Sequence, residues 1–246
     1  MRVIVLTGSG LSADSGLPTF RGAGGLYDGV PAERLLSADG YRRDPEAIER
    51  WLDRLRVAAD RAEPNAAHRG LAGYQRRHPD TLLATQNVDL LLERAGAAEV
   101  LHLHGRLDRL RCLGHAHELV LEGSRWDAPE RCPTCASRLR SDVVLFDEPA
   151  PGYRPLHAAL RRATAADALV VIGTQGNVLP VGDFAREFPG LTILDNLHRS
   201  GTSLERNFDH VFEASAVDAI GAIVALLEER RAGRCAEAGS RESFPS

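Results

Sequence analysis

The sequence predicts an α/β fold, built as a doubly wound, Rossmann-like parallel sheet with a smaller second lobe. Short apolar runs alternate with segments of helical periodicity along most of the 246 residues. The first apolar run leads directly into a glycine-rich loop, which is a common start of a βαβ unit. Two segments interrupt the alternation, and we expect them to form the smaller lobe.

Six apolar runs are predicted to be strands. Each is short, and most are apolar on both faces, as the central strands of a parallel sheet are. The helical connections between them indicate βαβ units. The predicted strands are Val3–Thr7, Thr81–Ala84, Val100–Leu103, Val143–Phe146, Ala168–Ile172 and Leu191–Leu194.

Two helices are well signalled. Asp44 and Pro45 open the first, with proline at the first helical position, and Pro64 lies beyond its end. The last helix is predicted from about Val217 to about Arg231. The apolar residues at helical spacing in the first helix are Ile48, Trp51, Leu52, Leu55 and Ala59.

These elements predict two lobes and a tail. Residues 29–64 would supply the helical part of the smaller lobe, and residues 106–140, which hold a Cys/His cluster, its zinc-ribbon-like part. Residues 232–246 are polar and contain Gly and Ser, so we expect a flexible tail. The Rossmann-like domain is expected to comprise residues 1–28, 65–105 and 141–231.

Composition excludes several classes of protein. Lys and Arg number 30 and Asp and Glu 34, a net charge of -4, without the basic footprint of a nucleic-acid-binding protein. The first apolar run has the length of a strand and not of a signal or membrane segment. Three of the 4 cysteines lie between residues 112 and 135, which fits a reducing compartment. We expect a soluble cytoplasmic protein with no nucleic-acid or membrane partner.

The glycine loop is the first candidate binding element. Gly8-Ser9-Gly10 follows a predicted strand, where a backbone can approach a pyrophosphate closely and the next helix points free N–H groups at it. The third glycine, Gly16, comes later than in the Gly-x-Gly-x-x-Gly pattern, so a tight βα turn is the alternative. Beyond it, Phe20 could cover a ring and Arg21 could pair with phosphate. The alternative is a core phenylalanine and a surface arginine.

Polar residues also follow two other predicted strands. Gln86, Asn87 and Asp89 come after one strand, and His104 after the next. Ligands of open α/β sheets bind beyond the carboxyl ends of the strands, so these side chains should meet at one site. Alternatively, Asn87 is the N-cap of a helix over Val88–Arg94, and His104 is a loop histidine. Several such residues beside a glycine loop favour a functional site.

These motifs resemble those of the sirtuins, the NAD-dependent protein deacylases, and most closely the compact bacterial members. The similarity covers most of residues 1–228, and the motifs occur in the family's order. They are Thr7 to Arg21, Thr85-Gln86-Asn87-Val88-Asp89, His104-Gly105, Asp142-Val143-Val144-Leu145-Phe146 and Gly173-Thr174.

The resemblance implies a role for each motif. The glycine loop would hold the pyrophosphate, and Phe20 and Arg21 would cover the nicotinamide. Gln86 and Asn87 would position the nicotinamide ribose, and Asp89 would bind the amide. The pyrophosphate and adenosine contacts implied are Gly8, Ser9, Gly10, Ser12, Ala13, Gly173, Thr174, Gln175, Asn196 and Ala216. Val143, Val144 and Phe146 would pair with the substrate peptide by β-augmentation.

The resemblance also implies the chemistry. The acyl oxygen of an acyl-lysine attacks the anomeric carbon as nicotinamide leaves, and a base then activates a ribose hydroxyl that attacks the acyl carbon. His104 is the expected base, assisted by Asn87 and Asp89, because imidazole titrates near neutral pH. The products would be free lysine, nicotinamide and O-acyl-ADP-ribose.

Sirtuins carry two Cys-x-x-Cys pairs that bind one structural zinc ion. Here the second pair, Cys132 and Cys135, is intact, whereas the first reads Cys112-x-x-His115. A Cys₃His set binds zinc well, so we expect one ion at these four residues. His117 is an alternative to His115, and a site that no longer binds metal is the other alternative.

Other departures concern the substrate and the adenosine contacts. Ser9, Asp147, Gln175 and His198 replace the family's usual Ala, Gly, Ser and Glu. Some bacterial sirtuins bind the succinyl carboxylate through a Tyr-x-x-Arg pair, and alignment places Leu52 and Leu55 at those positions. These residues could simply pack the core, but they supply no cation. We expect neutral acyl groups to be preferred over succinyl.

The sequence leaves three further functional hypotheses. The same site could transfer ADP-ribose to another nucleophile or hydrolyse NAD, and a non-catalytic NAD sensor is a third possibility. A base at His104 has no use in a pure sensor. The glycine spacing argues against a fourth class, the dehydrogenases.

Overall fold

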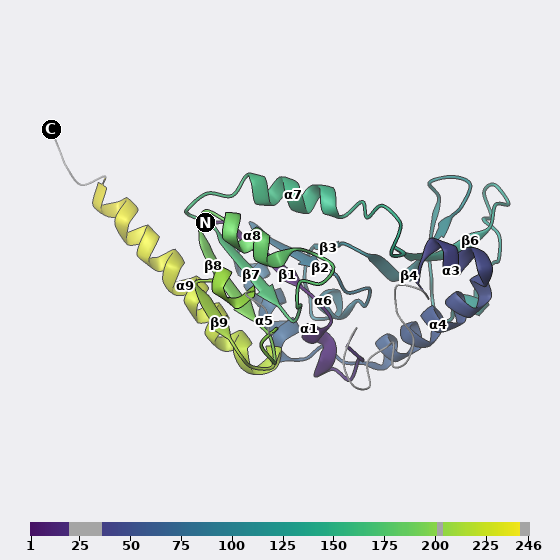
Figure 1. Cartoon of the computed structure of the whole chain (residues 1–246), viewed down its shortest axis with the longest axis horizontal. Coiled ribbons are helices and arrows are strands. Elements are labelled where there is room, and N and C mark those ends of the chain that lie inside the picture. The colour runs from purple at the N-terminus through teal and green to yellow at the C-terminus, as the bar shows by residue number, and fades with distance from the viewer. Residues whose placement is uncertain (20–35, 201–203, 242–246) are drawn as a thin grey trace.

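The computed structural model describes residues 1–19, 36–200 and 204–241, with side chains described as far as residue 233. Its centre is a six-stranded parallel sheet in the order β3-β2-β1-β7-β8-β9 (Figure 1). The strands are β1 (Val3–Thr7), β2 (Thr81–Thr85), β3 (Val100–His102), β7 (Ala168–Ile172), β8 (Leu191–Asp195) and β9 (His210–Phe212). This sheet confirms the predicted doubly wound α/β class.

Helices cover both faces of this sheet with their apolar sides. Helices α5 (Ala66–Arg77) and α9 (Ala216–Arg241) pack on one face through a core that includes Val5, Val170 and Ile223. Helices α7 (Tyr153–Arg161) and α8 (Val181–Glu187) pack on the other through a second core. Because both faces are covered, β1 and β7 are buried along their whole length and read as continuous apolar runs.

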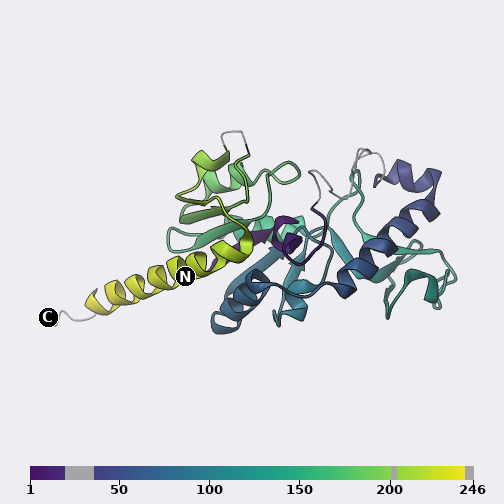
Figure 2. The same cartoon turned by 90° about the horizontal axis from the view of Figure 1, so that it is seen from below.

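The smaller lobe lies at the opposite end of the molecule from the end of α9 (Figure 2). It contains α3 (Ala38–Arg43), α4 (Pro45–Arg61) and an antiparallel sheet of β4 (Gly105–Cys112), β5 (Glu118–Val120) and β6 (Leu139–Val143). Asp44 caps α4 by accepting a hydrogen bond from the Ala47 N–H, as the sequence predicted for this start. The residue bounds proposed for the two lobes stay a prediction.

Short helices and 3₁₀ turns complete the described part of the chain. Helix α1 (Gly10–Ala13) follows β1, and α6 (Leu91–Arg94) follows β2. The 3₁₀ turns η1 (Arg125–Asp127) and η2 (Leu204–Asn207) lie in the smaller lobe and before β9. No helix in the described ranges combines the length and the apolar character needed to cross a membrane.

Several predicted bounds are wrong. The strand expected at Val143–Phe146 is β6 at Leu139–Val143, because it pairs with β4 of the smaller lobe and not with the parallel sheet. Helix α6 begins at Leu91, so Asn87 is not its N-cap. Helix α9 continues through Arg241, ten residues past the predicted end.

Strand β8 ends in a buried carboxyl, and one of its oxygens has no hydrogen-bond partner among the described residues. Asp195 is 1% exposed, and its Oδ1 atom has no hydrogen bond. Its neighbours in the sheet register are Ile172 and Phe212, which are apolar. Burial raises the pKa of Asp195 to about 7. The charged form of this carboxyl therefore lowers the stability of the folded state, and the protonated form does not.

We expect Asp195→Asn to stabilise the protein at high pH. The folded-state pKa lies above the unfolded value, so the stability that the neutral carboxyl provides is lost as the pH rises toward about 7. The gain should reach at most about 4 kcal/mol near pH 8 and shrink toward pH 5. Urea unfolding of both proteins at the two pH values measures it.

Asp167→Asn is the matched control. The Asp167 carboxylate accepts hydrogen bonds from Arg2 and Thr164, which lower its pKa to about 2 against the effect of burial. This substitution should destabilise the protein at neutral pH. If the stability difference between wild type and Asp195→Asn does not change with pH, the raised pKa of Asp195 is wrong.

Candidate active site

A large cavity of about 570 Å³ opens beyond the carboxyl ends of the parallel strands. Strands β1 and β7 are neighbours, and the strand order runs outward from them in both directions. This is the topological switch point, where open α/β sheets bind their ligands. The cavity continues from this edge to the smaller lobe, where Leu52 of α4 and Val143 of β6 line it.

The loops after β1 and β7 lie against each other at this edge. The Gly8 N–H donates to the Ile172 carbonyl, and the Gly10 N–H donates to the Gly173 carbonyl. A Cβ on Gly10 would lie 2.6 Å from the Gly173 Cα atom, and Gly173 itself has φ +66°. Only glycine fits this approach without strain. The result is a backbone cradle in which Gly8, Gly10 and Gly173 leave room for a pyrophosphate to approach.

Two amides connect this cradle to neighbouring strands. The Gln86 Nε2 donates to the Thr174 hydroxyl at 3.1 Å, and the Asn196 Nδ2 donates to the Thr174 carbonyl at 3.0 Å. Asn196 follows β8 and is buried. Thr174 and Asn196, two of the residues predicted on the adenosine side, are therefore joined by a direct hydrogen bond at one edge of the sheet.

A buried hydrogen-bond network centres on Ser12. Its hydroxyl donates to the Asp89 carboxylate at 2.9 Å and accepts from the Asn87 amide at 3.0 Å. The His68 ring lies 3.3 Å from the same hydroxyl, and its other nitrogen accepts from the Asn65 N–H. Nε2 of His68 therefore carries the ring proton and donates to Ser12. Burial raises the pKa of Asp89 and lowers that of His68 to about 4.

No sequence motif marked His68 as a site residue. It completes the capping box of α5, in which the Asn65 side chain accepts from backbone N–H groups and His68 accepts from the Asn65 N–H. An Asn followed three residues later by a polar side chain is a signal for such a box, although His is an unusual partner in it. The network fixes Asn87 and Asp89 relative to the glycine loop.

His104 is held as a neutral ring of one tautomer. Its Nδ1 lies 3.0 Å from the Gln86 carbonyl, which can only accept, so Nδ1 carries the proton. Its Nε2 lies 2.7 Å from the Tyr153 hydroxyl and accepts from it. Burial lowers the pKa of His104, although the bond to Gln86 opposes this. The ring can therefore serve as a base at neutral pH, and Nε2 is the atom that takes the proton.

The smaller lobe contributes the apolar part of the cavity. Leu52 and Leu55 of α4 line it, as predicted for the substrate side. Arg56 cannot reach it, because its guanidinium bonds the Asp53 carboxylate and the Leu107 carbonyl. Arg54 is exposed and does not line the cavity. The other apolar residues of this part are Leu17, Leu36, Trp51, Val88, Leu107, Val143 and Leu145.

The segment after β6 joins the two lobes. The Val144 N–H donates to the His104 carbonyl at 2.9 Å, and the Phe146 N–H donates to the Leu36 carbonyl at 2.8 Å. The Asp147 carboxylate accepts from the Ala38 N–H at the start of α3. Asp147 therefore anchors this segment to the smaller lobe. Phe146 stays 37% exposed at the cavity.

The cavity gathers most of the predicted site residues. Ala13 and Ala216 do not line it, and Phe20 and Arg21 lie outside the described residues. Tyr153 also lines the cavity beside His104. It was not predicted, because a single tyrosine at the start of a helix forms no motif that indicates a site. The predicted residues that line it are Gly8, Ser9, Gly10, Ser12, Leu52, Leu55, Gln86, Asn87, Asp89, His104, Val143, Val144, Phe146, Gly173, Thr174, Gln175 and Asn196.

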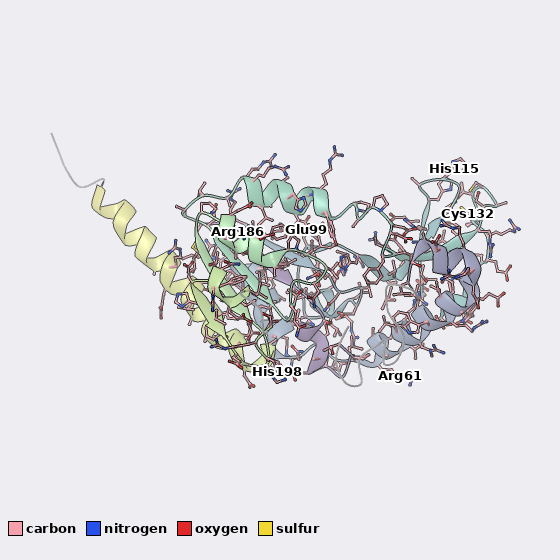
Figure 3. All side chains as sticks on the ribbon, in the orientation of Figure 1. Arg61, Glu99, His115, Cys132, Arg186 and His198 are labelled. Atoms are coloured by element: carbon pink, nitrogen blue, oxygen red, sulfur yellow. The ribbon has the colours of Figure 1, made fainter. Side chains whose placement is uncertain are left out.

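A separate cluster of metal ligands lies in the smaller lobe. Within the described part of the chain, the ligand atoms of Cys112, His117, Cys132 and Cys135 all lie within 4.8 Å of one another. The prediction of His115 is therefore wrong, and the alternative, His117, is the residue that joins the cluster. His115 lies two residues earlier in the turn and is exposed. Figure 3 labels His115 and Cys132 at the end of the smaller lobe far from α9.

The donor set of this cluster fits zinc. The Cys112 and Cys135 sulfurs are 3.4 Å apart, and the Cys132 sulfur is 3.3 Å from His117 Nδ1. Burial alone would raise the pKa of Cys132, but donors including His117 lower it to about 6, toward the thiolate that binds metal. The cluster holds together β4 and the loops beside it, as a structural Cys₃His site would.

Comparison with known proteins gives a consistent result. A sequence model described as the Sir2 family matches residues 8–180. An NAD-dependent protein deacylase of Campylobacter jejuni is 38% identical over 228 residues, which are 92% of this chain and 95% of the relative. A protein of the same name from Thermococcus kodakarensis is 39% identical, with 80% of each chain covered.

Solved structures agree. A Sir2 homologue in complex with NAD superposes with a TM-score of 0.79 at 32% identity, covering 93% of this chain and 90% of that one. A second Sir2 structure, with a deacetylated peptide and an acetyl ADP ribose, gives a TM-score of 0.77 at 25% identity, covering 91% and 92%.

Proposed function

Because this chain belongs to the Sir2 family, we propose that it is an NAD-dependent protein lysine deacylase that yields free lysine, nicotinamide and O-acyl-ADP-ribose. One observation carries the proposal. A single cavity joins the glycine cradle, the Asn87–Ser12–Asp89 network and the neutral His104 ring. A protein that only sensed NAD would not need a base at that point.

The residues have separate roles in this proposal. NAD supplies an anomeric carbon whose leaving group, nicotinamide, is already cationic. The glycine loop at Gly8 and Gly10 lets the pyrophosphate approach the backbone closely, and Asn87 and Asp89 hold the nicotinamide ribose and the amide. The acyl oxygen of the substrate then bonds to the anomeric carbon as nicotinamide leaves with the electron pair. Nε2 of His104 takes the proton of a ribose hydroxyl that attacks the acyl carbon. The C–N bond then breaks to release the lysine amine, and a water molecule adds its oxygen to the acyl carbon, which leaves O-acyl-ADP-ribose.

The substrate approaches through the smaller lobe. Val143, Val144 and Phe146 lie along the cavity, and we propose that this segment pairs with an extended peptide that carries the acyl-lysine. Zinc at Cys112, His117, Cys132 and Cys135 is a structural ion that holds the lobe in shape. Cysteines that must stay reduced to bind it support a cytoplasmic location.

Product analysis tests the function. The protein is incubated with NAD and an acetyl-lysine peptide, and the products are separated by mass spectrometry. O-acyl-ADP-ribose is expected. Free ADP-ribose alone would indicate an NAD hydrolase, a labelled protein would indicate an ADP-ribosyltransferase, and bound but unchanged NAD would indicate a sensor.

We expect a preference for neutral acyl groups. In the described part of the cavity, the acyl side is apolar, and no cation projects from α4 into it. An unpaired carboxylate there would be strongly disfavoured. Acetyl- and butyryl-lysine versions of one peptide should therefore react at least about tenfold faster than the succinyl version. Comparison of kcat/KM for the three peptides measures this.

A double substitution provides the matched control. Leu52→Tyr with Leu55→Arg restores the pair that binds a carboxylate in succinyl-accepting relatives, on the same face of α4. The variant should lose rate with butyryl-lysine and gain rate with succinyl-lysine. Faster removal of succinyl than of acetyl by the wild-type protein would show that the acyl assignment is wrong.

A further inference from the structure

Tyr153 contacts the one atom that the proposed reaction needs as a base. Nδ1 of His104 is bound to the Gln86 carbonyl, so the ring can accept a proton only at Nε2. The Tyr153 hydroxyl lies 2.7 Å from Nε2, and the two rings meet edge to face with centroids 5.7 Å apart. A hydrogen bond of this kind fixes the direction of the lone pair.

Backbone packing determines the place of Tyr153. It is the first residue of α7, and Gly152 precedes it. A Cβ on Gly152 would lie 2.7 Å from the His102 carbonyl and 2.8 Å from the Leu103 Cα atom. The start of α7 therefore packs directly on the two residues before His104. Any larger residue at position 152 would push Tyr153 away from the base.

The tyrosine ring is also held from its other side. It lies against the His157 ring, with centroids 6.3 Å apart, and His157 meets the Phe184 ring of α8 edge to face at 5.7 Å. This row of rings connects the base to the core on the α7 and α8 face of the sheet. Tyr153 is thus a fixed support for His104 and not a loop side chain that happens to touch it.

The other ionisable groups of the cavity have different partners. Asp89 bonds Ser12 and the Leu91 N–H, and Glu148 bonds Arg111 and Arg140. His198 lines the cavity beyond Asn196 on the β8 side. Burial raises the pKa of Tyr153, so its hydroxyl keeps its proton at working pH. Among the described residues, Tyr153 is the ionisable side chain for which a hydrogen bond to His104 is seen.

We propose that Tyr153 is a positioning residue for the base, which holds the His104 ring so that the Nε2 lone pair faces the ribose hydroxyl. This inference rests on the proposed deacylation. The Tyr153 hydroxyl holds the ring in this orientation before the substrate binds, and the ribose hydroxyl then takes its place at Nε2. Tyr153 acts through His104 and takes part in no bond that forms or breaks.

The proposal separates two steps of the reaction. Nicotinamide departure needs no base, whereas attack by the ribose hydroxyl does. Tyr153→Phe keeps the ring contact and removes the hydroxyl. Deacylation should fall by about 3- to 10-fold, because the imidazole is then no longer held in this orientation before the ribose hydroxyl arrives. Exchange of labelled nicotinamide into NAD, measured with the same acyl peptide, should stay at the wild-type rate.

A double variant tests whether the effect passes through the histidine. In a His104→Ala background, Tyr153→Phe should cause no further loss of deacylation. Tyr74→Phe is the matched control, since Tyr74 is a buried tyrosine of α5 that does not line the cavity. It should leave deacylation and exchange unchanged.

An NMR measurement on the free protein gives a readout that does not depend on activity. With 15N-labelled histidine, the Nε2 resonance of His104 should move in Tyr153→Phe, and the Nδ1 resonance should not. This result would stand even if the protein had another reaction. An unmoved Nε2 signal, equal losses of exchange and deacylation, or unchanged or faster deacylation in Tyr153→Phe would overturn the proposal.

Discussion

Replacing His104 with alanine should reduce deacylation at least about a hundredfold, because the general base is removed from the step that needs it. The backbone cradle of Gly8, Gly10 and Gly173 does not depend on this side chain, so NAD should bind with nearly unchanged affinity. Nicotinamide exchange should also persist. Steady-state kinetics, calorimetric titration with NAD and an exchange assay measure the three quantities on one preparation.

The pH profile of the wild-type protein tests the same assignment. Burial lowers the pKa of His104, so the neutral ring is present at lower pH than for an ordinary histidine. The acid limb of kcat/KM for deacylation should lie below the ordinary imidazole value of about 6.5. It should be absent from the residual activity of His104→Ala.

His78→Ala is a suitable control for this experiment. His78 caps the end of α5, where its ring contacts the Glu228 carboxylate, and it does not line the cavity. Its replacement should leave deacylation close to the wild-type rate. Near-normal turnover of His104→Ala would show that His104 is not the general base.

Removing a zinc ligand should have the second large effect, on stability. Cys132→Ala takes one thiolate from the group of Cys112, His117 and Cys135, and the purified protein should contain well under one equivalent of zinc. Structural zinc in small domains contributes on the order of 10 kcal/mol to folding, so the sheet of β4, β5 and β6 should unfold first. Metal analysis and hydrogen exchange by mass spectrometry measure the two effects.

Two histidine variants make this test specific. His117→Ala should lose zinc, whereas His115→Ala should retain it, although the two residues are only two positions apart. Chelation should lower stability before it lowers activity, because the cluster lies in the smaller lobe outside the residues that line the cavity. Zinc-free native protein, or loss of zinc from His115→Ala alone, would refute the ligand assignment.

The central strands were the part of the fold that local pattern could predict. β1 and β7 occur at the predicted residues because helices cover both of their faces, which leaves a continuous apolar run as the signal. Val143–Phe146 has the same apolar character but lies at a junction between lobes. There Val144 bonds the His104 carbonyl and Phe146 bonds the Leu36 carbonyl, and those partners are distant in sequence.

Strand β9 was not predicted because it is short and sits at the edge of the sheet. His210 and Val211 are exposed, so the segment lacks the apolar pattern of a buried strand. Strand β4 was hidden for a different reason, since Arg106, Arg109 and Arg111 alternate with its buried leucines and resemble a solvated segment.

The candidate site likewise contains residues that the sequence could predict and residues that it could not. Residues at strand ends, such as Asn87 and His104, could be located because the topology determines where those ends meet. Tyr153 and His68 could not, because they reach the site from helices α7 and α5 whose packing the sequence does not reveal. The choice of His117 over His115 depended on the geometry of one turn, since both lie at usable ligand spacing.

The bond between the Val144 N–H and the His104 carbonyl has a mechanical consequence. It joins the segment proposed to hold the substrate peptide directly to the residue proposed as the base. A hinge motion that widened the crevice would have to carry both together or break this bond. The position of a bound acyl-lysine relative to the imidazole then depends on this bond, although Asp147 ties the same segment to α3 of the smaller lobe. Tolerance for substrates of different size would come from the side formed by Leu36 and α4.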